Sequence, residues 1–172
     1  MINYLATQKN WQNAFSDTIT SFAELAQALD LPIDSFDSQV GQFPLKVPRR
    51  FVQKMAKGDI HDPLLKQVLP TFQETVQVTG FVTDPLDEQH ANPVKGIIHK
   101  YASRVLIPVT GACVVNCRYC FRQHFDYHEN LPTHNDWQAI SAYITAHPAI
   151  NEVILSGGDP LSLSNRRLLE IF

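Results

Sequence analysis

The sequence predicts an α/β protein in which a mainly helical region, residues 1–96, precedes the first βα units of a partial TIM-like barrel, residues 97–172. Two short apolar runs, at 105–109 and 153–155, have the length and composition of buried strands. A helical pattern at 135–147 lies between them, and strand–helix–strand order is typical of a parallel sheet. A complete barrel needs about 250 residues, so we expect this chain to form only part of one.

The helices expected in the first region have recognisable start and stop signals. A capping box at 21–24 (SFAE) opens a helix whose apolar positions continue to residue 29. A second amphipathic run follows Pro48 and stops at Gly58, and a third spans 62–70 between two prolines. Residues 73–82 alternate only loosely and fit either a strand or an extended loop. The apolar stripes predict a hydrophobic core.

Composition excludes several classes of protein. A net charge of −3 leaves no basic footprint for nucleic acid. The first thirty residues contain no unbroken apolar run, so we expect neither a signal peptide nor a membrane span. The chain has only three cysteines, and they are clustered as for metal ligation, which favours a reducing cytoplasm over a disulfide framework.

All three cysteines fall within GACVVNCRYCFR, residues 111–122, which we call the cysteine loop. Their C-x3-C-x2-C spacing allows three thiolates to hold three corners of a four-iron cluster and leaves one iron open. Zinc is the alternative, because His124 could complete a Cys3His site in a non-catalytic binding module. The loop follows the strand at 105–109, where barrels place their ligand chemistry, and this position favours iron and sulfur.

A second motif, VILSGGDP, covers residues 153–160. Its apolar start reads as a buried strand, and its adjacent glycines allow backbone to approach a ligand closely. Taken alone, such a motif is usually an ordinary turn between a strand and a helix. Its place about forty residues after the cysteine loop favours a functional interpretation.

Together these motifs resemble the radical S-adenosylmethionine (SAM) superfamily, and within it the lysine 2,3-aminomutase family. The matching segments are HKYASRVL (99–106), CRYCFR (117–122), SGGDPL (156–161), RRFV (49–52), KGD (57–59), DPLLKQVL (62–69) and GFVTDPLDEQH (80–90). The last four are most similar to the branch that makes β-lysine for elongation factor P. The resemblance covers nearly the whole chain from about Trp11 onward.

The resemblance implies a role for particular residues. The cluster ligands are Cys113, Cys117 and Cys120, and the SAM-binding residues are Tyr119, Ser156, Gly157, Gly158 and Asp159. Arg122 matches the arginine that binds the substrate carboxylate, and Lys100 and Arg104 match residues that bind the phosphate of pyridoxal phosphate. For Tyr119, Arg122 and Lys100, an ordinary structural role stays open. Gln123 departs from the family, which more often has a second arginine there.

The resemblance also implies a reaction and partners. A cluster-bound SAM gives a 5′-deoxyadenosyl radical, which takes hydrogen from L-lysine held on pyridoxal 5′-phosphate, and the amino group migrates to the β-carbon. Flavodoxin or ferredoxin is the expected reductant, and elongation factor P with its lysyl ligase is the expected user of β-lysine. The Schiff-base lysine and the acids that bind the distal ammonium are expected beyond Phe172. We therefore expect the 172 residues alone to be unstable and catalytically inactive.

Overall fold

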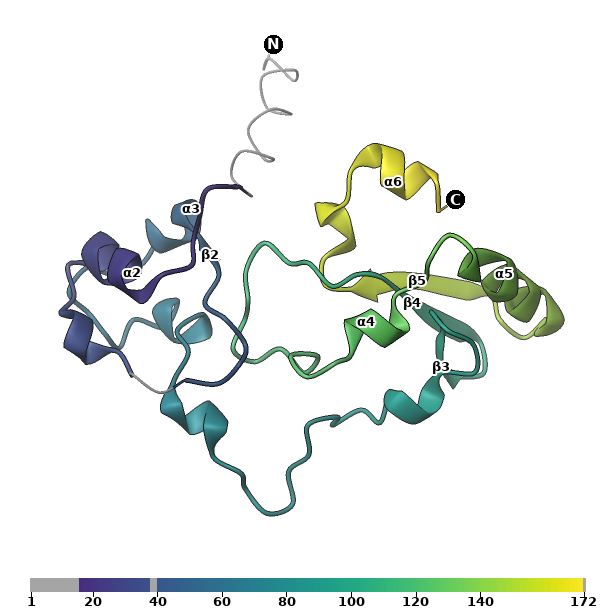
Figure 1. Ribbon diagram of the computed structural model, residues 1–172, viewed down its shortest axis with the longest axis horizontal. Coiled ribbons are helices and arrows are strands. Elements are labelled where there is room, and N and C mark those ends of the chain that lie inside the picture. Colours follow the sequence, from purple (N-terminus) through teal and green to yellow (C-terminus); the bar gives the residue numbers. More distant parts are fainter. Residues whose placement is uncertain (1–15, 38–39, 172) are drawn as a thin grey trace, which may run out of the picture. The chain divides into compact units, whose positions relative to one another are not determined.

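The computed structural model describes residues 16–37 and 40–171 (Figure 1). Contacts between residues divide the chain into two units. Unit 1 contains the described residues up to Gly80 together with Val114–Cys120, and unit 2 contains Phe81–Cys113 and the residues from Phe121 onward. The domain boundary predicted between residues 96 and 97 stays a prediction.

Unit 1 is built from short helices and a two-stranded sheet. β1 (Thr18–Ile19) pairs antiparallel with β2 (Val47–Pro48). The helices α2 (Phe22–Leu29) and α3 (Arg49–Val52) follow these two strands. The 3-10 helices of this unit are Ile33–Ser35, Leu65–Gln67 and Phe72–Thr75.

The apolar face of α2 is buried as its spacing predicts. Leu25 and Leu29 lie in a core whose other fully or nearly enclosed members include Ile19, Val47, Leu65 and Val68. The predicted capping box is wrong, because within the described residues the Ser21 side chain accepts no capping bond. Glu24 pairs with Arg49 instead. The buried apolar stripe is therefore the predicted feature of this helix that the structure confirms.

A single carboxylate organises the segment that was predicted to be a helix at 62–70. Oδ1 of Asp62 accepts hydrogen bonds from the backbone N–H groups of Leu64 and Leu65, at 2.8 and 2.9 Å. Oδ2 accepts one from Ala56, at 2.9 Å. These bonds stabilise a tight turn, and the helical part of the segment is limited to the 3-10 helix Leu65–Gln67. The prediction of a full helix is therefore wrong.

Unit 2 contains a three-stranded sheet in the order β3–β4–β5. β4 (Arg104–Thr110) and β5 (Glu152–Gly157) are parallel, with Ile107 opposite Leu155, which confirms the two predicted strands. β3 (Ile98–Tyr101) pairs antiparallel with β4 and was not predicted. The parallel pair brings the ends of both motif-bearing strands to one edge of the sheet.

The chain crosses from β4 to β5 through the predicted helix α5 (Asp136–Ala146), which Figure 1 shows beside the sheet. Ile97, Val105, Ile107 and Ile140 form the core between helix and strands. The 3-10 helices Gln89–Ala91 and Pro160–Ser162 and the short helices α4 (Tyr127–Asn130) and α6 (Asn165–Leu169) complete the unit. The mixed α/β class is thus confirmed. None of the helices in the described ranges has the length and apolarity needed to cross a bilayer.

Candidate metal centre

The three cysteines are half-buried, and none of them forms a disulfide within the described residues. Cys113 follows β4 and belongs to unit 2, whereas Cys117 and Cys120 belong to unit 1 and share a turn in which the Cys120 N–H donates to the Cys117 carbonyl at 3.1 Å. Across residues 16–37 and 40–171, no group of three or more His, Cys, Asp or Glu side chains is already gathered around a metal position. A soft, sulfur-only donor set nevertheless fits an iron–sulfur cluster. Convergence of all three thiolates stays a prediction.

The part of the cysteine loop that carries Cys117 and Cys120 is fixed to unit 1 by its backbone. The Asn116 N–H donates to the Lys46 carbonyl at 2.9 Å, and the Arg118 N–H donates to the Gln67 carbonyl at 2.8 Å. The Asn116 side-chain amide adds a bond to the Pro44 carbonyl at 3.0 Å. Residues that the sequence indicated only as core or loop therefore support two of the candidate ligands.

Tyr119 lies on the surface of the loop, 71% exposed. A hydrogen bond with the sulfur of Cys117, followed by the charge of that thiolate, raises the pKa of the Tyr119 hydroxyl above its ordinary value. A donor to a cluster sulfur is one of the features that tune the potential of iron–sulfur clusters. Contact of Tyr119 with the adenine of SAM stays a prediction.

The two glycines of the second motif lie against the start of the cysteine loop. A Cβ atom at Gly157 would be 2.3 Å from the Thr110 carbonyl oxygen, and one at Gly158 would be 2.3 Å from that of Ala112. Gly157 also has a φ of +108°, which a side chain would strain. The Gly158 N–H donates to Thr110 at 2.6 Å and the Asp159 N–H to Ala112 at 2.8 Å. The glycines thus permit backbone contact between the two motifs.

The remaining members of the second motif have local partners. The Asp159 carboxylate accepts a hydrogen bond from the Leu161 N–H at 3.0 Å and caps the 3-10 helix that follows. The Ser156 hydroxyl accepts one from Nη1 of Arg122 at 3.0 Å. Their assignment to SAM stays a prediction.

Arg122 is buried and paired with a carboxylate that the sequence did not indicate. Its Nε and Nη2 donate to the two oxygens of Glu88 at 2.8 and 2.6 Å, and the two side chains are 9% and 5% exposed. The Nε–Nη2 edge of the guanidinium is therefore occupied by a protein carboxylate. Because Nη1 also donates to Ser156, the predicted contact of Arg122 with a substrate carboxylate stays a prediction.

Lys100 and Arg104, the residues expected at the phosphate of pyridoxal phosphate, occupy the strands of unit 2. Lys100 on β3 donates to the Leu86 carbonyl. Arg104 begins β4 and pairs with Glu152 at 3.1 Å, with both side chains about half exposed. Their predicted role remains untested by these contacts.

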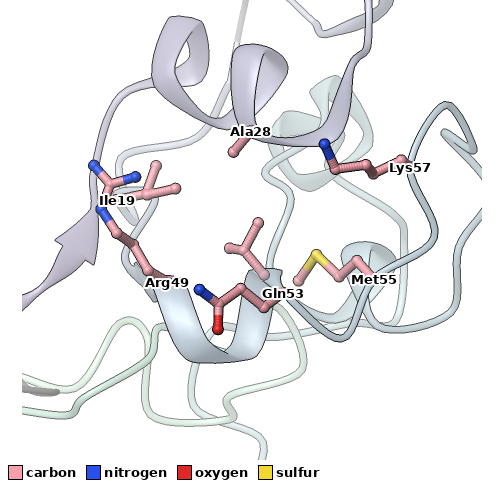
Figure 2. Close-up of a pocket in the computed structure, with 7 residues that line it drawn as sticks. Ile19, Ala28, Arg49, Gln53, Met55 and Lys57 are labelled. Atoms are coloured by element: carbon pink, nitrogen blue, oxygen red, sulfur yellow. The ribbon is translucent and has the colours of Figure 1, made fainter.

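A cavity of about 350 Å³ lies in unit 1, and its lining contains none of the cysteine-loop or glycine-motif residues (Figure 2). Its lining residues are Ile19, Ala28, Arg49, Val52, Gln53, Met55 and Lys57. Both cations on its rim have carboxylate partners, since Arg49 pairs with Asp17 and Glu24, and Lys57 pairs with Asp30. The cavity therefore offers no uncompensated charge to a ligand.

Two carboxylates that pair with arginines of the cysteine loop, the half-buried Glu74 and the buried Glu88, were not indicated by the sequence. Glu74 pairs with Arg118, 44 positions away, and Glu88 pairs with Arg122, 34 positions away. No spacing rule links residues so far apart, and single acidic residues in loops are usually exposed. The arginines on either side of Cys120 could have indicated that such carboxylates exist, because buried guanidinium groups require partners.

Comparison with known proteins agrees with this geometry. The model of the 4Fe-4S single cluster domain family matches residues 102–172, which include the cysteine loop and the glycine turn. The chain is 45% identical over 164 residues to the L-lysine 2,3-aminomutase of Haemophilus influenzae and 43% identical over 166 residues to that of Escherichia coli strain K12. Each match covers 94% of this chain and 48% of the relative. The Clostridium subterminale enzyme of the same name is 29% identical over 168 residues, which are 95% of this chain and 40% of that protein.

The cysteine loop, the glycine turn and the parallel strands that carry them define an iron–sulfur protein of the radical SAM class. The matched relatives identify a narrower family within this class. The chain belongs to the lysine 2,3-aminomutase family, and it spans about half the length of the curated relatives it matches.

Proposed function

We propose that this chain is the cluster- and SAM-binding part of a lysine 2,3-aminomutase, an isomerase that converts L-lysine to β-lysine. The observation that carries the proposal is the pairing of two motifs on neighbouring parallel strands. The cysteine loop follows β4, the glycine turn ends β5, and the two are in backbone contact at Ala112 and Gly158. Relatives named for this reaction are up to 45% identical to the chain.

In this proposal Cys113, Cys117 and Cys120 hold three irons of a [4Fe–4S] cluster. When bound, the cluster supplies the electron that splits SAM, and pyridoxal 5′-phosphate supplies electron delocalisation while the amino group moves. Ser156 and the backbone of the Gly157–Asp159 turn bind the methionyl amino group, since carbonyl and carboxylate oxygens accept from an ammonium. Tyr119 covers the adenine.

Arg122 orients the substrate carboxylate in this proposal. Because Glu88 already neutralises Arg122 and Gln123 carries no charge, recognition depends on directed hydrogen bonds more than on net positive charge. Lys100 and Arg104 bind the phosphate of pyridoxal 5′-phosphate.

The proposal extends to the whole protein. The strands β4 and β5 begin a TIM-like barrel whose remaining strands, together with the Schiff-base lysine, are supplied by sequence corresponding to the other half of the relatives. A flavodoxin or ferredoxin reduces the cluster in the cytoplasm. β-Lysine then passes to elongation factor P through a lysyl ligase.

Anaerobic reconstitution of the chain with iron and sulfide tests the proposal. We expect a brown protein with broad absorbance near about 400 nm and about four irons per chain. Under strong reductant the full-length protein should split SAM into methionine and 5′-deoxyadenosine, and Cys117→Ser should lose both the cluster and the cleavage. A colourless protein that retains one zinc would support the Cys3His alternative. The isolated chain should form no β-lysine.

A further inference from the structure

Arg118, between two of the candidate ligands, is a buried charge held from three sides. Its Nε donates to Oε1 of Glu74 at 2.9 Å, and its Nη2 donates to the other oxygen of the same carboxylate. Nη1 lies 3.4 Å from the Pro44 carbonyl oxygen, and the guanidinium carbon lies 5.0 Å from the ring centre of Phe43. The Arg118 side chain is only 7% exposed, so solvent contributes little to its environment.

Glu74 is also restrained by a contact other than Arg118. Its side chain is 18% exposed, and Oε1 also accepts a hydrogen bond from the Thr71 N–H at 3.2 Å. That bond is half of a capping box that starts the 3-10 helix Phe72–Thr75. The carboxylate cannot turn away from Arg118 without losing the cap.

This pair completes a set of bonds around the backbone that carries Cys117 and Cys120. The Arg118 N–H is bonded to Gln67, the Asn116 N–H is bonded to Lys46, and Val115 packs against the core of unit 1. Each of these contacts restrains the turn from outside, and none of them involves a thiol. Like the backbone bond to Gln67, the side-chain pair starts at Arg118, between the two cysteines.

We propose that Glu74 and Arg118 are positioning residues for the iron–sulfur cluster. They hold Cys117 and Cys120 in a conformation that binds iron, although neither residue is itself a ligand. Outer partners that orient metal ligands typically change metal affinity by about 10- to 100-fold. The inference rests on the proposed cluster-binding function and adds to it a role for Glu74, which lies in a segment that the sequence indicated only as a strand or extended loop.

Glu74→Gln in the complete chain tests the proposal directly. The amide oxygen of glutamine can still accept from Thr71, but the charged, two-point contact with Arg118 is lost. We expect a reconstituted Glu74→Gln protein to lose its cluster to an iron chelator about tenfold faster than wild type, or more. Asp30→Asn, which breaks an exposed ion pair with Lys57 in the same unit, is the matched control and should retain the wild-type rate.

A second variant separates positioning from general stability. Glu74→Gln combined with Arg118→Met leaves no unpaired buried charge, so the thermal midpoint of its cluster-free form should return toward wild type. Its cluster should still be lost about tenfold faster than in wild type, because the restraint remains absent. Recovery of both properties together, or a wild-type chelation rate in Glu74→Gln, would overturn the proposal. A wild-type chain that binds no cluster would instead contradict the proposed function.

Discussion

Gly157 and Gly158 determine how closely the second motif approaches the first residues of the cysteine loop. Position 157 requires glycine for two reasons: its φ is positive, and a Cβ would collide with the backbone of Thr110. At Gly158 space alone is decisive, because a Cβ would lie 2.3, 2.7 and 2.9 Å from three backbone atoms of Ala112. Contact distances under 3.0 Å with backbone cannot be relieved by a rotamer change, so the turn itself would have to move.

Gly158→Ala should therefore open the contact between the two motifs. We expect it to lower the free energy of unfolding by about 1–3 kcal/mol, the usual range for overpacking. The amide of Asp159, which donates to Ala112 at 2.8 Å, should exchange its hydrogen at least about tenfold faster. Hydrogen exchange followed by NMR measures this effect at a single residue.

Gly58→Ala is the matched control for that experiment. Gly58 has a φ of +74°, but a Cβ there would meet no atom within 4 Å. Alanine at this position adds backbone strain of about 1–2 kcal/mol without any collision. The Asp159 amide should keep its wild-type exchange rate, and equal acceleration in both variants would show that the effect at Gly158 is not local.

Among single residues, sequence identified those whose chemistry is local and missed those whose partners are distant. The cysteines and the glycine pair were recognised because their spacing is short and their residue types are unusual at such positions. Glu74 and Glu88 were missed because a carboxylate has no distinguishing mark until the fold brings an arginine to it. The members of these pairs are 44 and 34 residues apart in the sequence, so the pairs can be recognised only in the three-dimensional structure.

At the scale of elements, the turn around Asp62 is stabilised by backbone hydrogen bonds to a single carboxylate. Backbone N–H groups, first that of Ala56 and then that of Leu65, lower the pKa of the Asp62 carboxyl below its ordinary value of 3.8. In the unfolded chain these donors are absent, so the unfolded state binds a proton at a higher pH than the folded state does. The stabilisation from Asp62 is therefore complete above the unfolded pKa and is lost as the pH falls through the folded pKa.

Asp62→Asn should remove this pH dependence. Asparagine keeps one acceptor oxygen for the turn but presents an NH2 group to the Ala56 N–H, so the variant should be less stable than wild type at pH 7. Urea midpoints measured between about pH 3 and pH 7 should fall with acid in wild type and fall less steeply in the variant. Asp34→Asn, which removes an exposed carboxylate, should keep the wild-type slope; parallel slopes for Asp62→Asn and wild type would contradict the assignment.

The elements that sequence predicted well are the ones with a continuous apolar signal. β4 and β5 were found because their central residues are apolar runs, and α5 because its apolar positions recur with helical spacing. β3 was missed because its sequence, IHKY, is mostly polar and its connection to β4, Ala102-Ser103, contains neither glycine nor asparagine. The helix at 62–70 was overextended because Asp62 and Pro63 start a tight turn as readily as they start a helix.

At the scale of the molecule, the outer strand of the unit 2 sheet carries exposed apolar side chains. Among the described residues β5 pairs only with β4, and Val153 and Ile154 are 45% and 36% exposed. Next to them an apolar hollow of about 300 Å³ is lined by side chains that include Trp137, Leu155 and Ile171. An exposed strand edge with apolar side chains is a site of intermolecular pairing.

The 172-residue chain should therefore self-associate, and a charge on this strand should reduce the association. Ile154→Lys is expected to lower the scattered light intensity of the purified chain and increase its monomer fraction, because a lysine at a sheet edge opposes strand addition. Size-exclusion chromatography with light scattering measures both. Gln138→Lys, which adds the same charge on an exposed position of α5, should leave self-association unchanged; equal effects would implicate net charge instead of the strand.

The bonds that Asn116 and Arg118 make to Pro44, Lys46, Gln67 and Glu74 have a practical consequence for protein engineering. A peptide that copies only the three cysteines and the residues between them keeps the bond from Cys120 to Cys117 but lacks these more distant acceptors. Transplanting this metal-binding loop into a foreign scaffold thus requires a host that also supplies a carboxylate and three carbonyl groups, in the places of those of Pro44, Lys46 and Gln67. Chimaeras that exchange the loop between relatives should exchange these distant acceptors with it.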